Sequence, residues 1–538
     1  MLIKIKAILS KNIYVKLIPI IILVTNSICQ SQGQPIQLNW LTPTLGIEAS
    51  DFLISPSNKI YTVGSDKSVA VEGDIMMMKY DSSGNILWRQ RYEGSNMQSD
   101  VANGLCLDDS ENVYICGREN DNFSTSNSII IKYDSAGNLK WLANTPNSRE
   151  AQGIISDGIN NIYALELLYD STISQYKAGL SKYDYSGNLI WFIQDTVNAE
   201  IVGYSIKTDR NNNIYIVGYT TELPPYQKSF LSKYDTSGML IWKKIFNDSI
   251  YIFSDTYLIS IDDSCNIYIS GYTTKAVSAT GFDCIAIKYD STGSQDWFRT
   301  WTVSGSNTEG PLAICSRNNR TSITGRLQLN SSSGLSDIFT ISYSSTGSLI
   351  FSDTLNDPYN NSDYGSDILI DSLNNTIITG TFGNAQSSRN INLIVASYDE
   401  FGNRFILDTM QTSRGLLIKE DAFNNLYLCG GFGDTINNFD YGSLLKYKRL
   451  INKIDNPNLI VFNEPVLYPN PTNSFLIVDN IVGNYNLTIL DMNGSVMGKY
   501  FCKGLNREII SLSYLLPGKY IIEMYKHELK YSKCIIKL

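Results

Sequence analysis

The chain has 538 residues, enough for roughly three to four domains of about 150 residues each. Charged residues make up 18% and hydrophobic residues 43%, and the formal net charge is −9. The only histidine in the sequence is His527. Because there is only one histidine, Ser–His–Asp and Cys–His nucleophile systems are excluded elsewhere in the chain, as is any multi-histidine metal site. The negative charge also argues against a nucleic-acid binder, which needs clustered Lys and Arg to neutralise phosphates.

The first 30 residues are typical of a secretory signal peptide. Four lysines and no acidic residue are followed by an apolar run over 17–24 and small or polar residues near Ser27. The run contains Pro19 and is too short for a membrane anchor, which needs about 20 apolar residues. Cys29 raises the alternative of a lipoprotein, but Ile28 is a poor residue before a lipidated cysteine. Because no later segment is long and apolar enough to cross a membrane, we expect an exported protein, either released or attached to the outer cell surface.

A unit of about fifty residues repeats through most of the chain. One element reads KYDSSGN, KYDSAGN, KYDYSGN, KYDTSGM and KYDSTGS in the first five units and decays in the later ones. A second element, such as NVYICG or NNIYIVG, precedes it in each unit. The tyrosines of the first element lie 49 to 55 residues apart and number eight: Tyr80, Tyr133, Tyr183, Tyr234, Tyr289, Tyr343, Tyr398 and Tyr447. The chain therefore carries eight copies of one structural unit.

Each unit is expected to form four strands, for example Gly104–Leu107, Val113–Gly117, Ile129–Tyr133 and Leu139–Trp141. Asp, Asn and Gly between the strands favour tight turns. Because four-stranded sheets of this kind cannot bury both faces alone, they stack radially, which predicts an eight-bladed β-propeller over residues 36–452. The segment 35–40 looks like an outermost strand that the last unit lacks, so we expect it to complete the eighth blade. The repeats resemble the bacterial β-propeller repeat family, which implies this fold and usually export, but no fixed activity.

The chain changes character after a proline-punctuated linker at 453–464. Apolar strand-like stretches and turns over 465–538 predict a small Ig-like β-sandwich, so the whole fold is expected to be all-β. The YPNP opening, the stretches LTILDMNGSVM and LSYLLPGKYIIEM and the lysine-flanked last strand resemble the type A sorting domain of the bacterial type IX secretion system. An ordinary accessory sandwich is the alternative. The resemblance implies the secretion machinery as a partner, passage across the outer membrane and removal of the tail, and it assigns as sorting-motif residues Tyr468, Pro469, Asn470, Pro471, Asp491, Gly494, Gly518, Tyr520 and Lys537.

Two sets of acidic residues recur with the repeat. One acid precedes the first strand of each of seven units: Glu48, Asp100, Glu150, Glu200, Asp255, Glu309 and Asp363. At the mouth of a central channel these carboxylates could hold a cation such as Ca²⁺, or each could accept hydrogen bonds as a structural residue of the repeat. The second set precedes the second strand, and because each turn offers mostly one carboxylate, turn capping explains it better than calcium: Asp108, Asp157, Asp209, Asp262, Asp371 and Asp421.

The cysteines and tyrosines give weaker signals. Cys106 and Cys116 flank one predicted hairpin, where either a disulfide or two buried thiols fit; Cys502 and Cys534 could pair in the tail. Most tyrosines fall at fixed strand positions, where they should pack between blades. The less regular ones are better candidates for a carbohydrate-binding surface: Tyr219, Tyr226, Tyr251 and Tyr272.

We therefore expect a secreted or surface-attached binding module with an unknown extracellular ligand, either glycan or protein, no catalytic residues and no cofactor apart from Ca²⁺. A carbohydrate-active lyase or hydrolase using carboxylates at the channel mouth is the first alternative, and a close acid pair with shifted pKa values would be its sign. A quinone-dependent dehydrogenase lacks its expected adjacent cysteines, and a purely structural surface component remains open. Residues 31–464 carry a net charge of −16, since the first 30 residues contribute +4 and residues 465–538 contribute +3 to the total of −9.

Overall fold

A computed structural model describes most of residues 36–537. Its description leaves out residues 1–35, 45–46, 67–72, 95–98, 123–124, 146, 158–160, 225, 276–280, 304–307, 329–334, 358–361, 384–391, 412, 435–438, 450–465, 469–474, 483–484, 493, 503–504, 527–528 and 538. The predicted signal peptide, the predicted linker, His527 and Pro469–Pro471 of the sorting motif therefore lie outside the described residues.

Every named element of the structure is a β-strand, and the strands of residues 36–449 form successive four-stranded antiparallel sheets. The first sheet along the chain contains β2 (Ile47–Ile54), β3 (Ile60–Asp66), β4 (Ile75–Tyr80) and β5 (Ile86–Tyr92). The second contains β6 (Val101–Leu107), β7 (Val113–Asn122), β8 (Thr125–Tyr133) and β9 (Leu139–Ala143). The third contains β10 (Ser148–Ser156), β11 (Ile162–Asp170), β12 (Gln175–Tyr183) and β13 (Leu189–Gln194). The fourth contains β14 (Ile201–Thr208), β15 (Ile214–Thr220), β16 (Lys228–Tyr234) and β17 (Leu240–Ile245).

The pattern continues through the second half of this region. The next sheet contains β18 (Tyr251–Ile261), β19 (Ile267–Lys275), β20 (Asp283–Tyr289) and β21 (Gln295–Trp301). It is followed by β22 (Thr308–Arg317), β23 (Arg320–Gln328), β24 (Asp337–Ser344) and β25 (Leu349–Leu355). Then come β26 (Tyr364–Ile370), β27 (Thr376–Phe382), β28 (Asn392–Tyr398) and β29 (Arg404–Gln411). The last of these sheets contains β30 (Ser413–Glu420), β31 (Leu426–Asp434), β32 (Phe439–Arg449) and, from the other end of the region, β1 (Ile36–Thr44).

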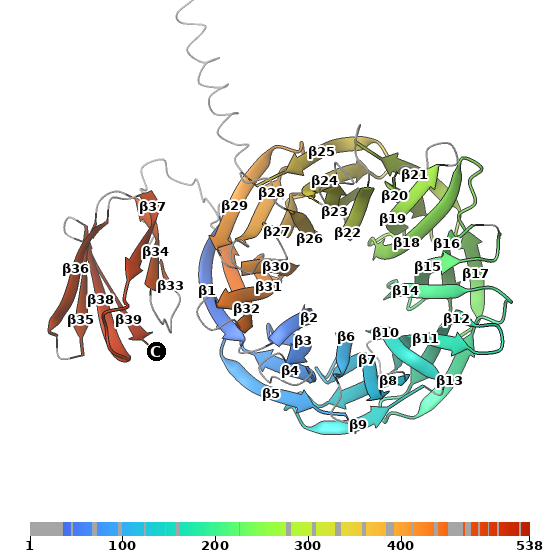
Figure 1. The fold of residues 1–538 in the computed structure, drawn as a ribbon, viewed down its shortest axis with the longest axis horizontal. Helices are drawn as coiled ribbons and strands as arrows, with labels where there is room; N and C mark the ends of the chain where they lie inside the picture. Colours follow the sequence, from blue (N-terminus) through green and yellow to red (C-terminus); the bar gives the residue numbers. More distant parts are fainter. Residues whose placement is uncertain are drawn as a thin grey trace, which may run out of the picture.

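These sheets stand around a central opening, with the first strand of each sheet innermost (Figure 1). Their cores lie between neighbours: Tyr61, Val63 and Ile75 of one sheet pack with Ile115 and Ile131 of the next. Such a core forms only when adjacent sheets stack, because the side chains on both faces of the middle strands are buried.

The ring is closed by strand pairing and by packing. β1 pairs antiparallel with β32, with Ile36 opposite Arg449 and Thr44 opposite Gly442. This confirms that the segment near the N-terminus supplies the outer strand that the last unit lacks. Phe52 and Ile60 of the first sheet pack with Tyr427 and Leu444 of the last, so the junction also has a hydrophobic core.

Two kinds of turn connect the strands, and the local sequence explains both. Glycines in the DSxGN turns adopt a left-handed backbone, as at Gly187 with φ +88°. Asparagines do so in the turn between the first two strands of a sheet, as at Asn212 with φ +61°. The second acidic set caps these turns, since Asp209 Oδ1 accepts the Asn211 and Asn213 amides at 2.9 Å, which confirms the capping interpretation.

The C-terminal region forms two further sheets. One contains β33 (Val466–Tyr468), β34 (Phe475–Val482) and β37 (Leu505–Ser511). The other contains β35 (Tyr485–Asp491), β36 (Val496–Cys502), β38 (Gly518–Lys526) and β39 (Leu529–Lys537). Leu476 and Ile510 of the first sheet share one buried core with Leu487, Ile522 and Ile535 of the second.

Cys106 and Cys116 are buried free thiols. The sequence allowed either a disulfide or two buried thiols at this hairpin, and the structure has the thiols. The side chains of Cys502 and Cys534 lie outside the described set. None of the described residues belongs to a helix that is long and apolar enough to cross a membrane.

Candidate functional site

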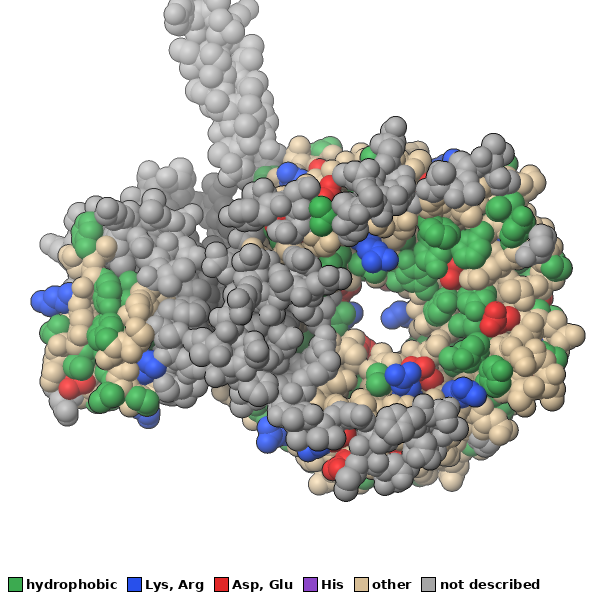
Figure 2. All heavy atoms as spheres, viewed as in Figure 1, with side chains coloured by type: hydrophobic (Ala, Val, Ile, Leu, Met, Phe, Trp, Pro, Cys, Tyr) green, Lys and Arg blue, Asp and Glu red, His purple; other side chains and the backbone are tan. Residues whose placement is uncertain are grey.

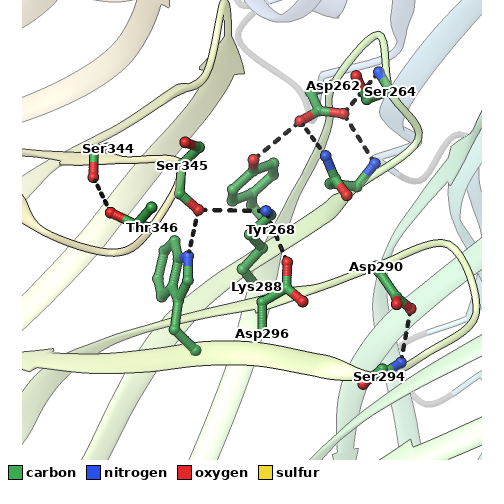
Figure 3. A network of polar contacts seen from close by, with 12 residues as sticks. Asp262, Ser264, Tyr268, Lys288, Asp290, Ser294, Asp296, Ser344, Ser345 and Thr346 are labelled. Carbon is green, nitrogen blue, oxygen red and sulfur yellow. Dashed lines mark hydrogen bonds and ion pairs between the residues drawn. The ribbon is translucent and has the colours of Figure 1, made fainter.

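The repeated motifs build a contact between neighbouring sheets, shown for one pair in Figure 3. Tyr268 donates its hydroxyl to Asp262 at 3.0 Å, and Lys288 lies over the Tyr268 ring at 5.8 Å from its centroid. Lys288 Nζ and the indole N–H of Trp297 both donate to the carbonyl of Ser345 in the next sheet, at 3.3 and 3.0 Å. The KYD lysine, the second-strand tyrosine and the tryptophan therefore serve blade contacts.

The same contact recurs around the ring and crosses its closure. Lys79 donates to Ser135 O at 2.9 Å and Lys132 to Tyr185 O at 2.7 Å. Lys446 of β32 donates to Ser82 O in the first sheet at 3.2 Å. Ten tyrosines of these motifs are less than 2% exposed, as expected for packing residues: Tyr61, Tyr80, Tyr114, Tyr163, Tyr183, Tyr215, Tyr268, Tyr398, Tyr427 and Tyr447.

The acids predicted before each first strand lie at the sheet edges, but several are enclosed. Asp100, Glu309 and Asp363 are 0%, 1% and 0% exposed. Asp363 accepts the Asp357 and Gly383 amides at 2.7 and 2.9 Å, and Asp100 accepts the Gly94 amide at 2.7 Å. These two carboxylates bind backbone amides around the entry to their sheets, in line with the structural alternative given for this set. Burial raises the pKa of Asp363 to about 7.

The remaining members of this set differ from one another. Glu150 accepts the Asn103 side-chain amide at 2.7 Å, and the Glu48 side chain is outside the described set. Glu200 and Asp255 lie among tyrosines, as described below. The described residues contain no group of three or more His, Cys, Asp or Glu side chains placed to hold a metal ion. A cation held by the seven acids thus stays a prediction.

The innermost strands carry charged residues that the sequence reasoning missed. Asp51 of β2 accepts the Leu105 amide at 3.2 Å, and Asp367 of β26 accepts the Ile418 amide at 2.9 Å, so each binds the neighbouring sheet. Loss of hydration opposes the charge on Lys419, but Asp367 and Asp51 outweigh it and raise the pKa of this lysine. The positive charge of Lys419 and the negative charges of Asp51 and Asp367 therefore stabilise one another.

Six aromatic side chains form a continuous belt across the fourth and fifth sheets, here called the aromatic belt: Tyr204, Tyr219, Phe253, Tyr257, Tyr272 and Phe282. The ring centroids of Tyr204 lie 5.9 Å from Tyr219 and 6.3 Å from Tyr257, which lies 5.8 Å from Tyr272. Phe253 stacks on Tyr272 at 5.9 Å with an interplanar angle of 11°. Figure 2 shows side chains of the hydrophobic class, which there includes tyrosine, gathered beside the central opening over these two sheets.

Bulges in the innermost strands place two of these rings. The pairing of β14 with β15 shifts between Gly203 and Ser205, which leaves Tyr204 as the extra residue. The pairing of β18 with β19 shifts between Thr256 and Leu258, which does the same for Tyr257. An extra residue is released from the ladder and re-aims its side chain, so both rings leave the core and remain only half-buried.

Two carboxylates accompany the belt. Asp255 is 4% exposed, and its Oδ2 lies 3.4 Å from the Tyr272 hydroxyl. Its Oδ1 is buried and makes no hydrogen bond of good geometry among the described residues, although the Gln227 side chain lies close enough to lower the pKa of this carboxylate. Burial raises the pKa of Asp255 to about 6. Burial also raises the pKa values of Tyr204 and Tyr219, with the charges of Asp255 and Glu200 adding to it, which places both acids close to these rings.

A shallow pocket of about 350 Å³ lies in the same sheets. Leu223, Tyr226 and Ile252 supply its apolar lining, and Lys228 and Asp248 supply charge. Among the tyrosines proposed as surface candidates, Tyr219 and Tyr272 lie in the belt and Tyr226 is 43% exposed in this pocket. Tyr251 was wrongly proposed: it is 8% exposed because it packs against Phe298 and donates to or accepts from Thr300 at 3.2 Å.

The belt residues that the sequence missed had a readable signal. Tyr204 and Tyr257 occupy the position that Asn103 and Gln152 hold in the preceding units. Each of the four is the extra residue of a bulge in the first strand of its sheet. An aromatic residue where other units place a polar one marks a local departure from the repeat. Phe253 and Phe282 lie outside the repeated motifs.

The described sorting-motif residues are mostly turn and strand positions. Asp491 caps a tight turn, accepting the Gly494 amide through its carbonyl at 3.1 Å while Gly494 has φ +85°. Tyr520 donates its hydroxyl to Leu516 O at 2.8 Å. Gly518 begins β38, Lys537 ends β39 and Tyr468 ends β33.

Comparison with known families agrees with this construction. Residues 466–537 match the family described as "Secretion system C-terminal sorting domain", and residues 190–223 match the family described as "Beta-propeller repeat". The chain thus combines β-propeller repeats with a type IX secretion C-terminal sorting domain, and both resemblances noted from the sequence are confirmed. The sorting domain implies interaction with the type IX machinery and points to secretion or attachment at the outer cell surface.

Individual proteins are similar to this chain only in part. An uncharacterized WD repeat-containing protein L264 of Acanthamoeba polyphaga mimivirus is 26% identical over 192 residues, which are 35% of this chain and 11% of that protein. The match therefore spans about a tenth of the viral protein's length.

Several solved structures share a similar strand arrangement. The β-propeller domain of the Trilobed protease from Pyrococcus furiosus is 11% identical, covering 69% of this chain and 97% of that one, with TM-score 0.39. The Pyrococcus horikoshii acylaminoacyl peptidase is 9% identical, covering 75% and 58%, with TM-score 0.37. A polysaccharide lyase described as PL25-Ulvanlyase is 8% identical, covering 76% and 95%, with TM-score 0.40.

Proposed function

We propose that this protein is an eight-bladed β-propeller, residues 36–452, exported by the signal peptide at 1–30 and delivered outside the cell by an Ig-like sorting sandwich at 465–538. Outside the cell it acts as a binding module, and the aromatic belt is its binding face. The observation that carries this proposal is the contrast between two sets of tyrosines. Most repeat tyrosines are buried in contacts between sheets, whereas the belt rings of the fourth and fifth sheets are only partly buried.

The negative charge of the repeat region favours an extracellular ligand that is not a polyanion. Residues 31–464 have a net charge of −16, and the belt contains Glu200 and Asp255. Polyanions such as nucleic acids would be repelled over this face.

A binding screen tests the proposal. The chain from residue 31 onward is immobilised and offered extracellular polysaccharides, proteins and metal ions, with Tyr204→Ala/Tyr272→Ala as the paired variant. We expect a ligand that the wild type captures and the double variant does not. Capture that is equal in both proteins would refute the belt as the binding face, and a matched melting temperature shows that the variant is folded.

Delivery is tested separately in a host that has a type IX system. Deletion of residues 466–538 is expected to leave the propeller inside the outer membrane, while the full chain reaches the surface or medium. Export of the truncated chain at the wild-type level would contradict delivery by the tail.

A carbohydrate-active lyase or hydrolase is the second candidate, and one observation favours it. The buried Asp255, with its pKa raised to about 6, lies beside the Tyr272 hydroxyl, so the belt holds an acid able to exchange a proton near neutral pH. Incubation of the wild type and Asp255→Asn with polysaccharides, followed by a reducing-end assay, tests it. Release of reducing ends by the wild type alone would support the enzyme, and no release by either protein would rule it out for those substrates.

A further inference from the structure

The ring faces of the belt are free of the cations that cover the repeat tyrosines. Lysines lie 4.8 to 5.8 Å from the ring centroids of the repeat tyrosines Tyr61, Tyr114, Tyr163, Tyr215, Tyr268 and Tyr427. Among the described side chains, no Lys or Arg lies over the rings of Tyr204, Tyr219, Tyr257 or Tyr272. Phe253 covers one face of the Tyr272 ring. Ring faces of the belt that carry neither a cation nor another ring are available for stacking by a ligand.

The belt links rings of the fourth and fifth sheets through successive contacts. It starts at Tyr219 on β15, passes through Tyr204 and Tyr257 on the innermost strands, and ends at Phe282 before β20. Phe282 also forms an isolated bridge with Thr308 of the next sheet and is 38% exposed. Successive rings lie 5.0 to 6.3 Å apart between centroids and are inclined to one another by 45° to 88°, so they form a continuous aromatic surface that is not flat. An extended ligand with repeated apolar faces can contact such a surface at several rings in turn.

The belt also has polar groups that suit hydroxyl donors. Asp255 Oδ1 is a buried acceptor that makes no hydrogen bond of good geometry among the described residues, with the Gln227 side chain nearby. Such an acceptor costs free energy unless a ligand or water completes it. Glu200 supplies a second carboxylate near Tyr204 and Tyr219. Carboxylate acceptors beside phenol rings are the groups that bind sugar hydroxyls while the rings stack on the sugar faces.

We propose that the aromatic belt binds a neutral polysaccharide chain laid across the fourth and fifth sheets, with Asp255 accepting a hydrogen bond from a sugar hydroxyl. This assignment rests on the proposed binding function and adds the chemical class of the ligand. Uronic-acid or sulfated glycans are disfavoured, because Glu200, Asp255 and the net charge of −16 over residues 31–464 repel them. A small organic cation is disfavoured because adjacent rings, 5.8 to 6.3 Å apart between centroids, contact one another directly and leave no room for a cation between them.

The chain from residue 31 onward is tested by affinity electrophoresis and calorimetry with three kinds of probe: neutral xylan and glucomannan, anionic alginate, and tetramethylammonium. We expect retardation by a neutral polysaccharide and none by alginate. Tyr204→Ala and Tyr272→Ala should each weaken binding roughly tenfold or more, and Asp255→Asn should weaken it by a smaller factor. Phe282→Ala is a milder variant at an exposed position, and it serves if either tyrosine variant fails to fold.

Tyr185→Ala is the matched control, since Tyr185 is 59% exposed on a turn outside the belt. Its binding should equal that of the wild type. Loss of binding in this control, or alginate bound as tightly as the neutral polymers, would overturn the assignment, as would failure of both neutral polymers to bind. Tetramethylammonium bound through the same tyrosines would overturn the glycan assignment and leave the proposed binding function standing, whereas binding of no probe or screened ligand would overturn both.

Discussion

Substitution of Gly187 by alanine should destabilise the propeller through one identifiable contact. Gly187 has φ +88°, and a Cβ at this position would lie 2.7 Å from Cδ2 and 2.9 Å from Cγ of Trp141 in the preceding sheet. The left-handed backbone costs a non-glycine residue about 1 to 2 kcal/mol. The indole must also shift, which breaks the bond from its N–H to Tyr185 O at 3.0 Å, a bond that contributes about 1 kcal/mol.

The displaced indole also loses part of its contacts with Tyr114 and Tyr183, whose ring centroids lie 5.8 and 6.5 Å away. The expected loss is therefore about 3 to 4 kcal/mol. If the ring unfolds as one unit, this lowers Tm by about 4 °C, because the entropy of unfolding is about 2 cal/mol/K per residue. Differential scanning calorimetry and urea unfolding of Gly187→Ala against the wild type measure both quantities.

A double-mutant cycle with Trp141→Ala isolates the contact. Without the indole, Gly187→Ala should cost only the backbone strain, so the coupling free energy is expected to be about 2 kcal/mol. Gly494→Ala is a control in the tail, where φ is +85° but nothing lies within 4 Å of the added Cβ. Equal costs of Gly187→Ala with and without Trp141 would refute packing of the turn on the indole.

Three further outcomes are expected. Asp255→Asn should flatten the pH dependence of stability: since the native pKa is raised to about 6 from 3.8, the native state binds the proton more tightly, and this stabilisation, present below pH 4, is lost as pH rises to above 6. The effect is on the order of 3 kcal/mol, and urea unfolding curves between pH 4 and 7 that have the same pH slope in both proteins would contradict it. Deletion of residues 36–44 leaves β32 unpaired at its outer edge, so we expect a lower melting temperature and association on size-exclusion chromatography; an unchanged, monodisperse protein would argue against strand closure. Unfolding without reductant followed by alkylation should label both Cys106 and Cys116, and a disulfide between them found by mass spectrometry would contradict the structure.

The repeated sheets of this protein could be predicted because the same short sequence motifs recur in successive units. Each DSxGN turn needs a left-handed glycine, and each KYD lysine donates to the next sheet, so the period in the sequence is the period in space. The pairing of β1 with β32 followed from a single tryptophan-bearing segment without a partner in its own unit.

The site was harder to predict, for two physical reasons. A bulge sets which way Tyr204 and Tyr257 point, and the sequence pattern of a strand does not show where its pairing slips by one residue. Periodicity also does not distinguish an exposed carboxylate from an enclosed one. Asp363 recurs with the repeat, yet it lies inside the fold because nearby amides bind it.

The closing sheet sets the order in which the propeller can be completed. Its outer strand is made of residues 36–44 and its other three strands of residues 413–449, so the first strand of the ring to leave the ribosome is the last to find its partner. During synthesis, the leading strand waits without its partner until more than 390 further residues have followed it. The ring can therefore close only after nearly all of this region has been made, and the incomplete ring exposes unpaired strand edges to proteases and chaperones until then.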